Sequence, residues 1–315
     1  MIRALGPDRT AIAALVLLVA GIALPFVVYP VVAIDLVCFG LFAVSLDLLF
    51  GYVGLLSFGQ ALFWGGAGYI AAIAIVRTHV DVALAIVAGV LYAVVAAALV
   101  GALAVRRSGI YFAMVTLAVA QIQYFVAVQF VDVTGGDNGL NLGARGRLLG
   151  IPVENDRVYY YIAFVVVAAA VWFALRLTRS PFGGVLQAMR ENEPRTIALG
   201  YRVERYKIAV FTIAGGLAGL AGALYSVGNH LAGLDMVDWH TSGAVVMMTI
   251  LGGIGTIVGP IVGAALFQLL EYFVSKTPIG EETNMVMGMI FGLCVLLFRR
   301  GIVGELLALR PRAKI

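Results

Sequence analysis

Long uncharged runs separated by short loops dominate this sequence of 315 residues. About 20 helical residues cross the hydrocarbon core of a bilayer, and the apolar runs approach that length. With 62% hydrophobic and 12% charged residues, the chain is too apolar for a soluble core of this size. We therefore predict an all-α polytopic membrane protein of one domain, 1–315, with about ten transmembrane helices. The predicted spans are 11–29, 31–50, 55–76, 82–105, 110–131, 158–177, 208–228, 241–252, 256–273 and 285–298.

Basic residues indicate how the chain is oriented in the membrane. Lys and Arg are retained on the cytoplasmic side during insertion. Ten crossings place both termini on one side, and most of the 21 basic residues then lie on that side. Reading 241–273 as one long helix would reverse the C-terminal tail, so we expect a short or re-entrant hairpin that bends at 252–255. Both termini are expected in the cytoplasm.

One segment between two apolar runs carries a dense set of charges. Its charged residues are Arg190, Glu191, Glu193, Arg195, Arg202, Glu204, Arg205 and Lys207. In a chain that is otherwise embedded in a membrane, such a segment faces water or a soluble partner. Pro194 favours the first turn of a helix and Gly200 favours its end, so we expect a short helix at 193–200 on the inner membrane surface.

Nucleotide and metal chemistry find little support in the sequence. There is no Gly-Lys pair for a P-loop, and the run GGIGTIVG lacks the spacing of a dinucleotide fingerprint. We expect His79, His230 and His240 near the outer membrane edge, without metal-ligand spacing or acidic partners. No cofactor, metal ion or enzymatic activity is therefore expected, and any ATP is hydrolysed by another subunit. The excess of basic residues is explained by their concentration on the cytoplasmic side of the membrane, so no nucleic-acid partner is expected.

Several polar side chains fall inside the predicted spans. Such residues suit a path for a small polar or zwitterionic solute, although hydrogen bonds between helices are an equally good explanation. The candidates for the path are Ser57, Gln60, Thr116 and Gln121. Ser57 and Gln60, three residues apart, are predicted to share one helix face. Asp35 and Asp47 are expected near opposite ends of one helix, with no basic partner inside the membrane.

Glycines define two further features. A loop on the outer side has the composition of tight turns and is a candidate for docking or gating: Thr134, Gly135, Gly136, Asp137, Asn138 and Gly139. Two rows of small residues at four-residue spacing predict close helix packing, within one subunit or between subunits. The glycines of these rows are Gly215, Gly219, Gly222, Gly255, Gly259 and Gly263.

Five motifs occur along the chain in a fixed order. They are SLDLLFGYVGLLSFGQALFWGGAGY (45–69), VTLAVAQI (115–122), TGGDNGL (134–140), RENEPRTIALGYRVERYK (190–207) followed by FTIAGGLAGLAGALY (211–225), and LGGIGTIVGPIVGA (251–264). In this succession they resemble the branched-chain amino acid ABC permeases of the LivM type. The resemblance implies the fold of a type II ABC importer permease in the bacterial inner membrane, surrounded by membrane lipid.

The same resemblance implies partners and a mechanism. A second related permease subunit, two cytoplasmic ATPase subunits and an extracytoplasmic solute-binding protein would complete an importer that works by alternating access. The cytoplasmic coupling loop would be 178–207, with ATPase contacts at Arg190, Glu191, Asn192, Glu193, Pro194, Arg195, Ala198 and Gly200. The chain departs from the common pattern at Arg195 and Thr196, where small residues are usual.

The substrate is expected to be a branched-chain or other hydrophobic amino acid. Urea or a short amide is an alternative substrate, because permeases for these solutes carry similar motifs. An ion-coupled secondary transporter is a further alternative, since the glycine-interrupted region 241–273 could form broken helices at mid-membrane.

Overall fold

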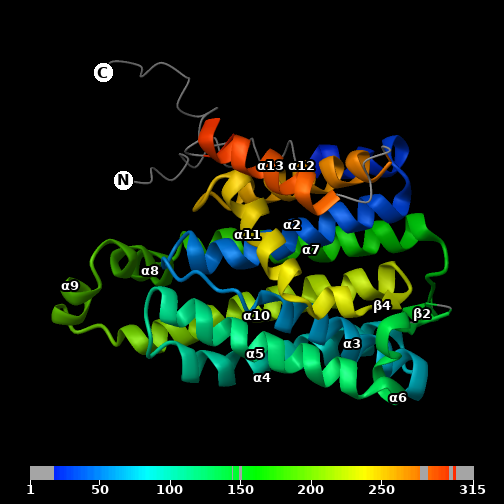
Figure 1. Cartoon of the computed structure of the whole chain (residues 1–315), viewed down its shortest axis with the longest axis horizontal. Coiled ribbons are helices and arrows are strands. Elements are labelled where there is room, and N and C mark those ends of the chain that lie inside the picture. The colour runs from blue at the N-terminus through cyan, green and yellow to red at the C-terminus, as the bar shows by residue number, and fades with distance from the viewer. Residues whose placement is uncertain (1–17, 144, 149–150, 277–282, 298–300, 303–315) are drawn as a thin grey trace.

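The computed structural model describes residues 18–143, 145–148, 151–276, 283–297 and 301–302. Helices dominate this part of the chain (Figure 1). After an apolar helix at Leu18–Val27, the α-helices are α2 (Pro30–Phe50), α3 (Gln60–Thr78), α4 (Val82–Ala104), α5 (Ile110–Gln129), α6 (Val131–Thr134), α7 (Asp156–Thr178), α8 (Pro181–Glu191), α9 (Glu193–Ala198), α10 (Val203–Gly228), α11 (Trp239–Gly252), α12 (Val258–Ser275) and α13 (Thr283–Leu297). Two 3₁₀ turns are η1 (Gly136–Asn138) and η2 (Leu234–Val237), and four two-residue strands are β1 (Leu140–Asn141), β2 (Arg147–Leu148), β3 (Ile151–Pro152) and β4 (Leu231–Ala232).

Within the described residues, seven helices are long and apolar enough to cross a membrane: α2, α3, α4, α5, α7, α10 and α12. Leu18–Val27 is a shorter apolar helix, and it and the short helices α11 and α13 lie at the positions of the other three predicted spans. The prediction of an all-α polytopic membrane protein is therefore confirmed. The start of the first predicted span and the two chain ends lie outside the described residues.

Three helices form the centre of the bundle. We compare the buried share of the most apolar 18-residue stretch of each spanning helix. Two thirds or more of this stretch is buried in α2, α3 and α10, against about one third in α4, α5, α7 and α12. Trp64 of α3 lies between Phe42 of α2 and Tyr225 of α10, with ring centroids 4.5 and 5.0 Å away. Lipid is as apolar as these side chains, so the close packing of the aromatic rings, not the exclusion of water, holds the three helices together.

The glycine row of α10 permits this packing. A Cβ at Gly222 would overlap the backbone of Trp64, and Cβ atoms at Gly215 and Gly219 would collide with alanine side chains of α4. Adding even one methyl group here would force the helices apart. The predicted close packing is thus found, and it lies within one subunit.

The second glycine row belongs to a hairpin of α11 and α12. Gly263 of α12 lies against the carbonyl of Met248 in α11, and Gly259 lies against Gly252. The expected bend between the two helices is confirmed, because residues 253–257 are not helical. Gly255 packs differently from the other members of the row, since its backbone nitrogen lies against Gly51 at the end of α2. It lies in the turn with φ of +79°, a backbone conformation that glycine adopts easily.

The two ends of the bundle differ in structure. The helices α8 and α9 project from one end, and the short strands and α6 gather at the opposite end (Figure 1). At the strand end β1 pairs antiparallel with β4, with Leu140 opposite Ala232. We call these the α9 end and the strand end. Span directions follow from this arrangement, since α2 runs toward the α9 end and α10 runs toward the strand end.

Arg145 holds the strand end together. Its guanidinium group is fully buried and donates hydrogen bonds to the carbonyls of Val227 (3.1 Å) and Gly228 (2.5 Å), the last two residues of α10. It also forms an ion pair of 2.6 Å with Asp156, at the first turn of α7. Carbonyls at the end of a helix have no partner inside the helix, so one arginine satisfies them and joins two spans.

Replacing Arg145 with Ala should lower the free energy of unfolding by about 2–4 kcal/mol, because the Gly228 carbonyl loses its donor and Asp156 loses its ion-pair partner. Unfolding in mixed detergent micelles, followed by tryptophan fluorescence, measures the loss. The exposed neighbour Arg147 is the matched control, and Arg147→Ala should change the stability by less than about 0.5 kcal/mol. Equal effects of the two substitutions would contradict this role of Arg145.

Candidate functional site

The charged segment forms two short helices at the α9 end. The predicted helix at 193–200 is found as α9, with Asn192 as its N-cap: the Asn192 side chain accepts a hydrogen bond of 2.9 Å from the backbone of Arg195. Gly200 follows α9 with φ of +90°. An L-residue with a side chain is strained in this conformation. The local sequence therefore defines both ends of α9, as Pro194 and Gly200 predicted.

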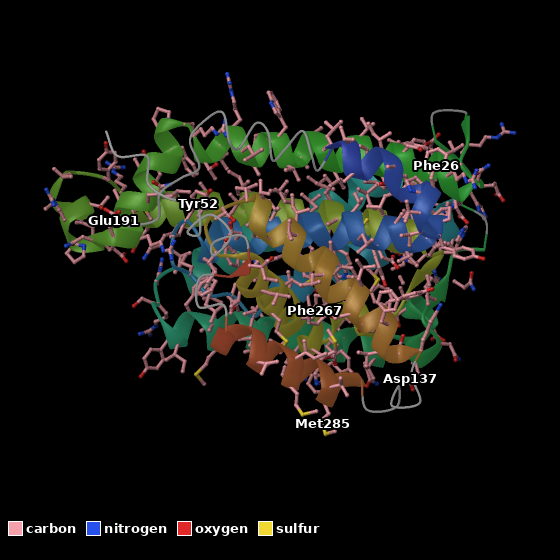
Figure 2. The ribbon with its side chains drawn as sticks, turned by 90° about the horizontal axis from the view of Figure 1, so that it is seen from above. Phe26, Tyr52, Asp137, Glu191, Phe267 and Met285 are labelled. Carbon is pink, nitrogen blue, oxygen red and sulfur yellow. The ribbon has the colours of Figure 1, made fainter. Side chains whose placement is uncertain are left out.

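An ion pair attaches α9 to the bundle. Lys207, buried at the start of α10, contacts Glu193 of α9 at 2.6 Å. On the outside of α9 and the loop behind it, the apolar side chains of Ile197, Leu199 and Tyr201 are exposed. Figure 2 shows Glu191 at this end of the molecule. A rigidly held surface that exposes both apolar and charged side chains is typical of a protein contact site.

The residues predicted to couple to an ATPase lie together at this end, with one difference in direction. Glu191, Asn192, Glu193, Pro194, Arg195, Ala198 and Gly200 belong to α8, α9 and the connecting turns. Arg190 instead points back to the bundle, where its guanidinium donates to the carbonyl of Gly51 at the end of α2.

The four residues predicted for a path lie on α3, on α5 and just before α3. The predicted common helix face of Ser57 and Gln60 is wrong, because α3 begins only at Gln60. Ser57 belongs to a non-helical segment, 51–59, and its hydroxyl accepts from the backbone of Gly59 (3.2 Å). Thr116 of α5 accepts from the backbone of Phe58 (3.2 Å). Both hydroxyls thus accept hydrogen bonds from backbone N–H groups that lie outside any helix.

Two amide side chains in this region keep unused hydrogen-bonding capacity. Gln60 is fully buried, and neither of its amide atoms has a partner among the described residues. The same holds for Nε2 of Gln121 on α5. Buried polar groups normally have partners, so these amides are available to a solute or to water.

The segment between α10 and α11 enters the bundle from the strand end, and we call residues 229–238 the re-entrant segment. A Cβ at Gly65, five residues after α3 begins, would lie 2.5 Å from the carbonyl oxygen of Met236. Ser242, near the start of α11, accepts a hydrogen bond of 2.9 Å from the backbone of Ala61. Figure 1 likewise shows α11 beginning in the middle of the bundle. With 14 residues, α11 is only about 21 Å long, and the re-entrant segment completes the crossing.

Charged side chains accompany this irregular backbone. Asp238 caps α11 by accepting from the backbone of His240 (2.7 Å), and its carboxyl group also contacts Nδ1 of His240 at 2.6 Å. Asp235 is exposed nearby. The expectation that His240 lacks an acidic partner is therefore wrong. A signal was present in the sequence, since an Asp-x-x-Asp pair precedes a helix too short to cross the bilayer.

The loop predicted for docking or gating lies at the strand end. Gly135, Gly136 and Gly139 have φ of +80°, +57° and +67°, which explains the density of glycine. The Thr134 hydroxyl ties the loop to α5 by donating to the carbonyl of Ala127 (2.7 Å). Asp137 and Asn138 are exposed at its tip, and Figure 2 shows Asp137 at the end opposite Glu191.

Comparison with known proteins identifies the family. Residues 29–297 match the family described as the permease component of branched-chain amino acid transport systems. The LivM permease of the high-affinity branched-chain amino acid transport system of Escherichia coli is 28% identical over 248 residues, which are 71% of this chain and 57% of that protein. A probable LivM permease of Methanocaldococcus jannaschii is 24% identical over 281 residues, 76% of this chain and 80% of that protein.

A further relative has a different substrate in its name. The ribose import permease RbsC of Bacillus subtilis is 30% identical over 172 residues, 53% of this chain and 51% of that protein. The chain spans a little over half the length of the Escherichia coli LivM, and no solved structure matches it. Because the family match extends over the described spans α2 to α13, the chain belongs to the family of permease components of branched-chain amino acid transport systems.

Proposed function

We propose that this chain is a membrane-spanning permease subunit of an ABC importer for branched-chain amino acids. The observation that supports this most strongly is the family match over residues 29–297, which includes both the α9 end and the re-entrant segment. The complete importer would contain a second related permease, two ATPase subunits and an extracytoplasmic solute-binding protein. This chain would contribute the path and the contacts for both kinds of soluble partner.

The α9 end is the proposed ATPase contact. Its charged segment, 190–207, carries eight charged residues, five of them basic, and would face the cytoplasm, in accord with the retention of basic residues on that side. The exposed Ile197, Leu199 and Tyr201 offer the apolar centre of a contact, and the surrounding charges offer its rim. The ion pair of Lys207 with Glu193 would transmit a displacement of α9 to α10.

The strand end is the proposed contact for the solute-binding protein. The loop 134–139 places Asp137 and Asn138 at its tip, and the pairing of β1 with β4 links this loop to the re-entrant segment. A partner that docks at the tip would therefore act on the path. The binding free energy of this contact can favour the outward-open state, as alternating access requires.

The path is proposed along the face where the re-entrant segment and the start of α11 meet α3 and α5. Non-helical backbone and exposed charged groups at membrane depth are stable only beside water or protein, because lipid cannot satisfy them. Asp235, Asp238 and His240 would thus face a water-filled path, and Gln60 and Gln121 would offer it their unpaired amide atoms. Tight selection of substrate would remain with the solute-binding protein.

Backbone strain at Gly200 gives a first prediction. Space around Gly200 is open, since a Cβ would meet no atom within 4 Å, so Gly200→Ala acts only through the φ of +90° and costs about 1–2 kcal/mol. We expect ATP-driven uptake per assembled complex to fall severalfold while the amount of complex changes little. Gly184→Ala in α8 has equally open surroundings but helical backbone, and should keep wild-type uptake. If both variants transport normally, α9 does not couple to the ATPase.

The water-filled path gives a second prediction. In lipid nanodiscs holding the assembled complex, with Cys38 and Cys294 replaced, His240→Cys should react with a charged, membrane-impermeant thiol reagent. The control is Leu91→Cys on the outer face of α4, where the side chain is similarly exposed (61%, against 68% for His240). That face is apolar, so Leu91→Cys should react only with a membrane-permeant maleimide. If His240→Cys, like Leu91→Cys, reacts only with the membrane-permeant maleimide, His240 lies outside the path.

The substrate gives a third prediction. Proteoliposomes that contain all subunits and ATP should import labelled leucine, with competition by isoleucine and valine. Gln60→Ala or Gln121→Ala should lower the rate without reordering these competitors, because the path offers no fixed charge to a side chain at these positions. Urea and ribose are included as competitors. Import of either one, with no entry and no competition by leucine, would overturn the amino acid assignment and leave the permease assignment standing.

A further inference from the structure

Asp47 makes the polar contacts at the turn between α11 and α12. It lies near the end of α2 and is fully buried. Its Oδ1 accepts a hydrogen bond of 2.6 Å from the backbone of Gly255, and its Oδ2 accepts one of 3.3 Å from the backbone of Ile257. Two backbone donors from the same turn cradle the carboxyl group as a nest does, and the same group lies at the N-terminal, positive end of α12.

The turn that Asp47 holds is strained. Gly253 and Gly255 have φ of +117° and +79°, and Ile257 has φ of +54°. A positive φ is a rare conformation for a β-branched residue such as Ile257 and costs energy that the surroundings must offset. Because the contacts of Asp47 offset this cost, the turn is expected to change conformation when those contacts change.

The opposite side of the same site contacts α8. The guanidinium of Arg190 donates to the carbonyl of Gly51, and Gly51 follows Asp47 by one helical turn, with its own N–H bonded to the Asp47 carbonyl (2.7 Å). There is no space for adjustment, because a Cβ at Gly51 would collide with Oδ1 of Asp47 and with the nitrogen of Gly255. A shift of α8 against Gly51 would therefore reach the turn directly.

The far end of α11 contacts the proposed path. This helix begins at Trp239, directly after the re-entrant segment, and ends at Gly252, directly before the strained turn. Helices transmit displacement along their axis as nearly rigid bodies, and packed interfaces change between discrete arrangements. The contacts thus form an unbroken series from α8 through Gly51, Asp47 and α11 to Asp238.

We propose that Asp47 is a positioning residue that couples the position of α8 and α9 to the re-entrant segment through α11. The proposal rests on the proposed function, since it concerns how ATP hydrolysis opens the path. When α8 moves with the ATPase, the end of α2 moves, Asp47 shifts its two backbone partners, and α11 carries the displacement to Asp235, Asp238 and His240. Loss of the contact should leave the ATPase active and the path unresponsive.

The alternative is that Asp47 only caps α12 and stabilises the fold. A structural role lowers the amount of assembled complex, and its ATP hydrolysis and uptake fall in proportion. A coupling role lowers the number of substrate molecules imported per ATP hydrolysed in each assembled complex. The ratio of the two rates therefore separates the two roles.

The test uses the complete complex in proteoliposomes and the variant Asp47→Asn, which keeps an acceptor for Gly255 and presents a donor toward the N–H of Ile257. We expect leucine imported per ATP to fall by about fivefold or more, the usual scale of coupling between sites. The control is Ser45→Ala on the same helix, where the buried hydroxyl bonds only to the carbonyl of Phe42 (2.6 Å). It should keep the wild-type ratio.

Arg190→Gln tests the other end of the same series, because it removes the contact with Gly51 and leaves both backbone donors to Asp47 in place. It should also lower the ratio, and it carries the test if Asp47→Asn does not assemble. A wild-type ratio in either assembled variant, or a proportional loss of both rates, would overturn the proposal. A wild-type complex that hydrolyses ATP and imports none of the tested substrates would overturn the proposed function itself, and the inference with it.

Discussion

Backbone polar groups in a membrane must find partners within the protein, and this constraint accounts for three of the buried polar residues of the bundle. Three breaks in its helices have a side chain from a distant element that satisfies their backbone groups. Thr116 serves residues 51–59, Arg145 serves the end of α10, and Asp47 serves the turn after α11. Buried polar side chains of this kind are expensive, and here they stabilise breaks in helices.

The breaks coincide with the features proposed to function. The re-entrant segment would expose Asp238 and His240 to a path, and the turn at 253–257 would respond to α8. Continuous helices such as α4 and α10 pack through small residues and form a stiff frame. A transporter needs both properties, because a stiff frame transmits force and an irregular segment with alternative hydrogen bonds can change conformation.

The range of solutes in the names of the relatives agrees with this distinction between a stiff frame and irregular segments. Relatives named for branched-chain amino acids and for ribose share sequence with this chain, although their solutes have little chemistry in common. The shared elements are therefore expected to be the frame and the coupling residues, and selectivity would come from a few path residues and from the solute-binding protein. Substrate cannot be assigned from the fold alone.

Much of this protein follows from local sequence. The length of the apolar runs determines the membrane class and the positions of the spans. Pro194 and Gly200 determine the bounds of α9, and the glycines at 252–255 determine the bend between α11 and α12. These features depend on residues within one or two helical turns, so sequence reasoning found them.

Tertiary structure alone decided which polar groups meet. Asp47 had no visible partner in the sequence because its partner is the backbone of Gly255, 208 residues away. Ser57 was placed wrongly on a helix, since the break before Gln60 depends on Thr116 of another span. The depth of the re-entrant segment depends on contacts of Met236 with α3. Backbone groups are identical at every position, and so only the folded arrangement determines which side chain satisfies them.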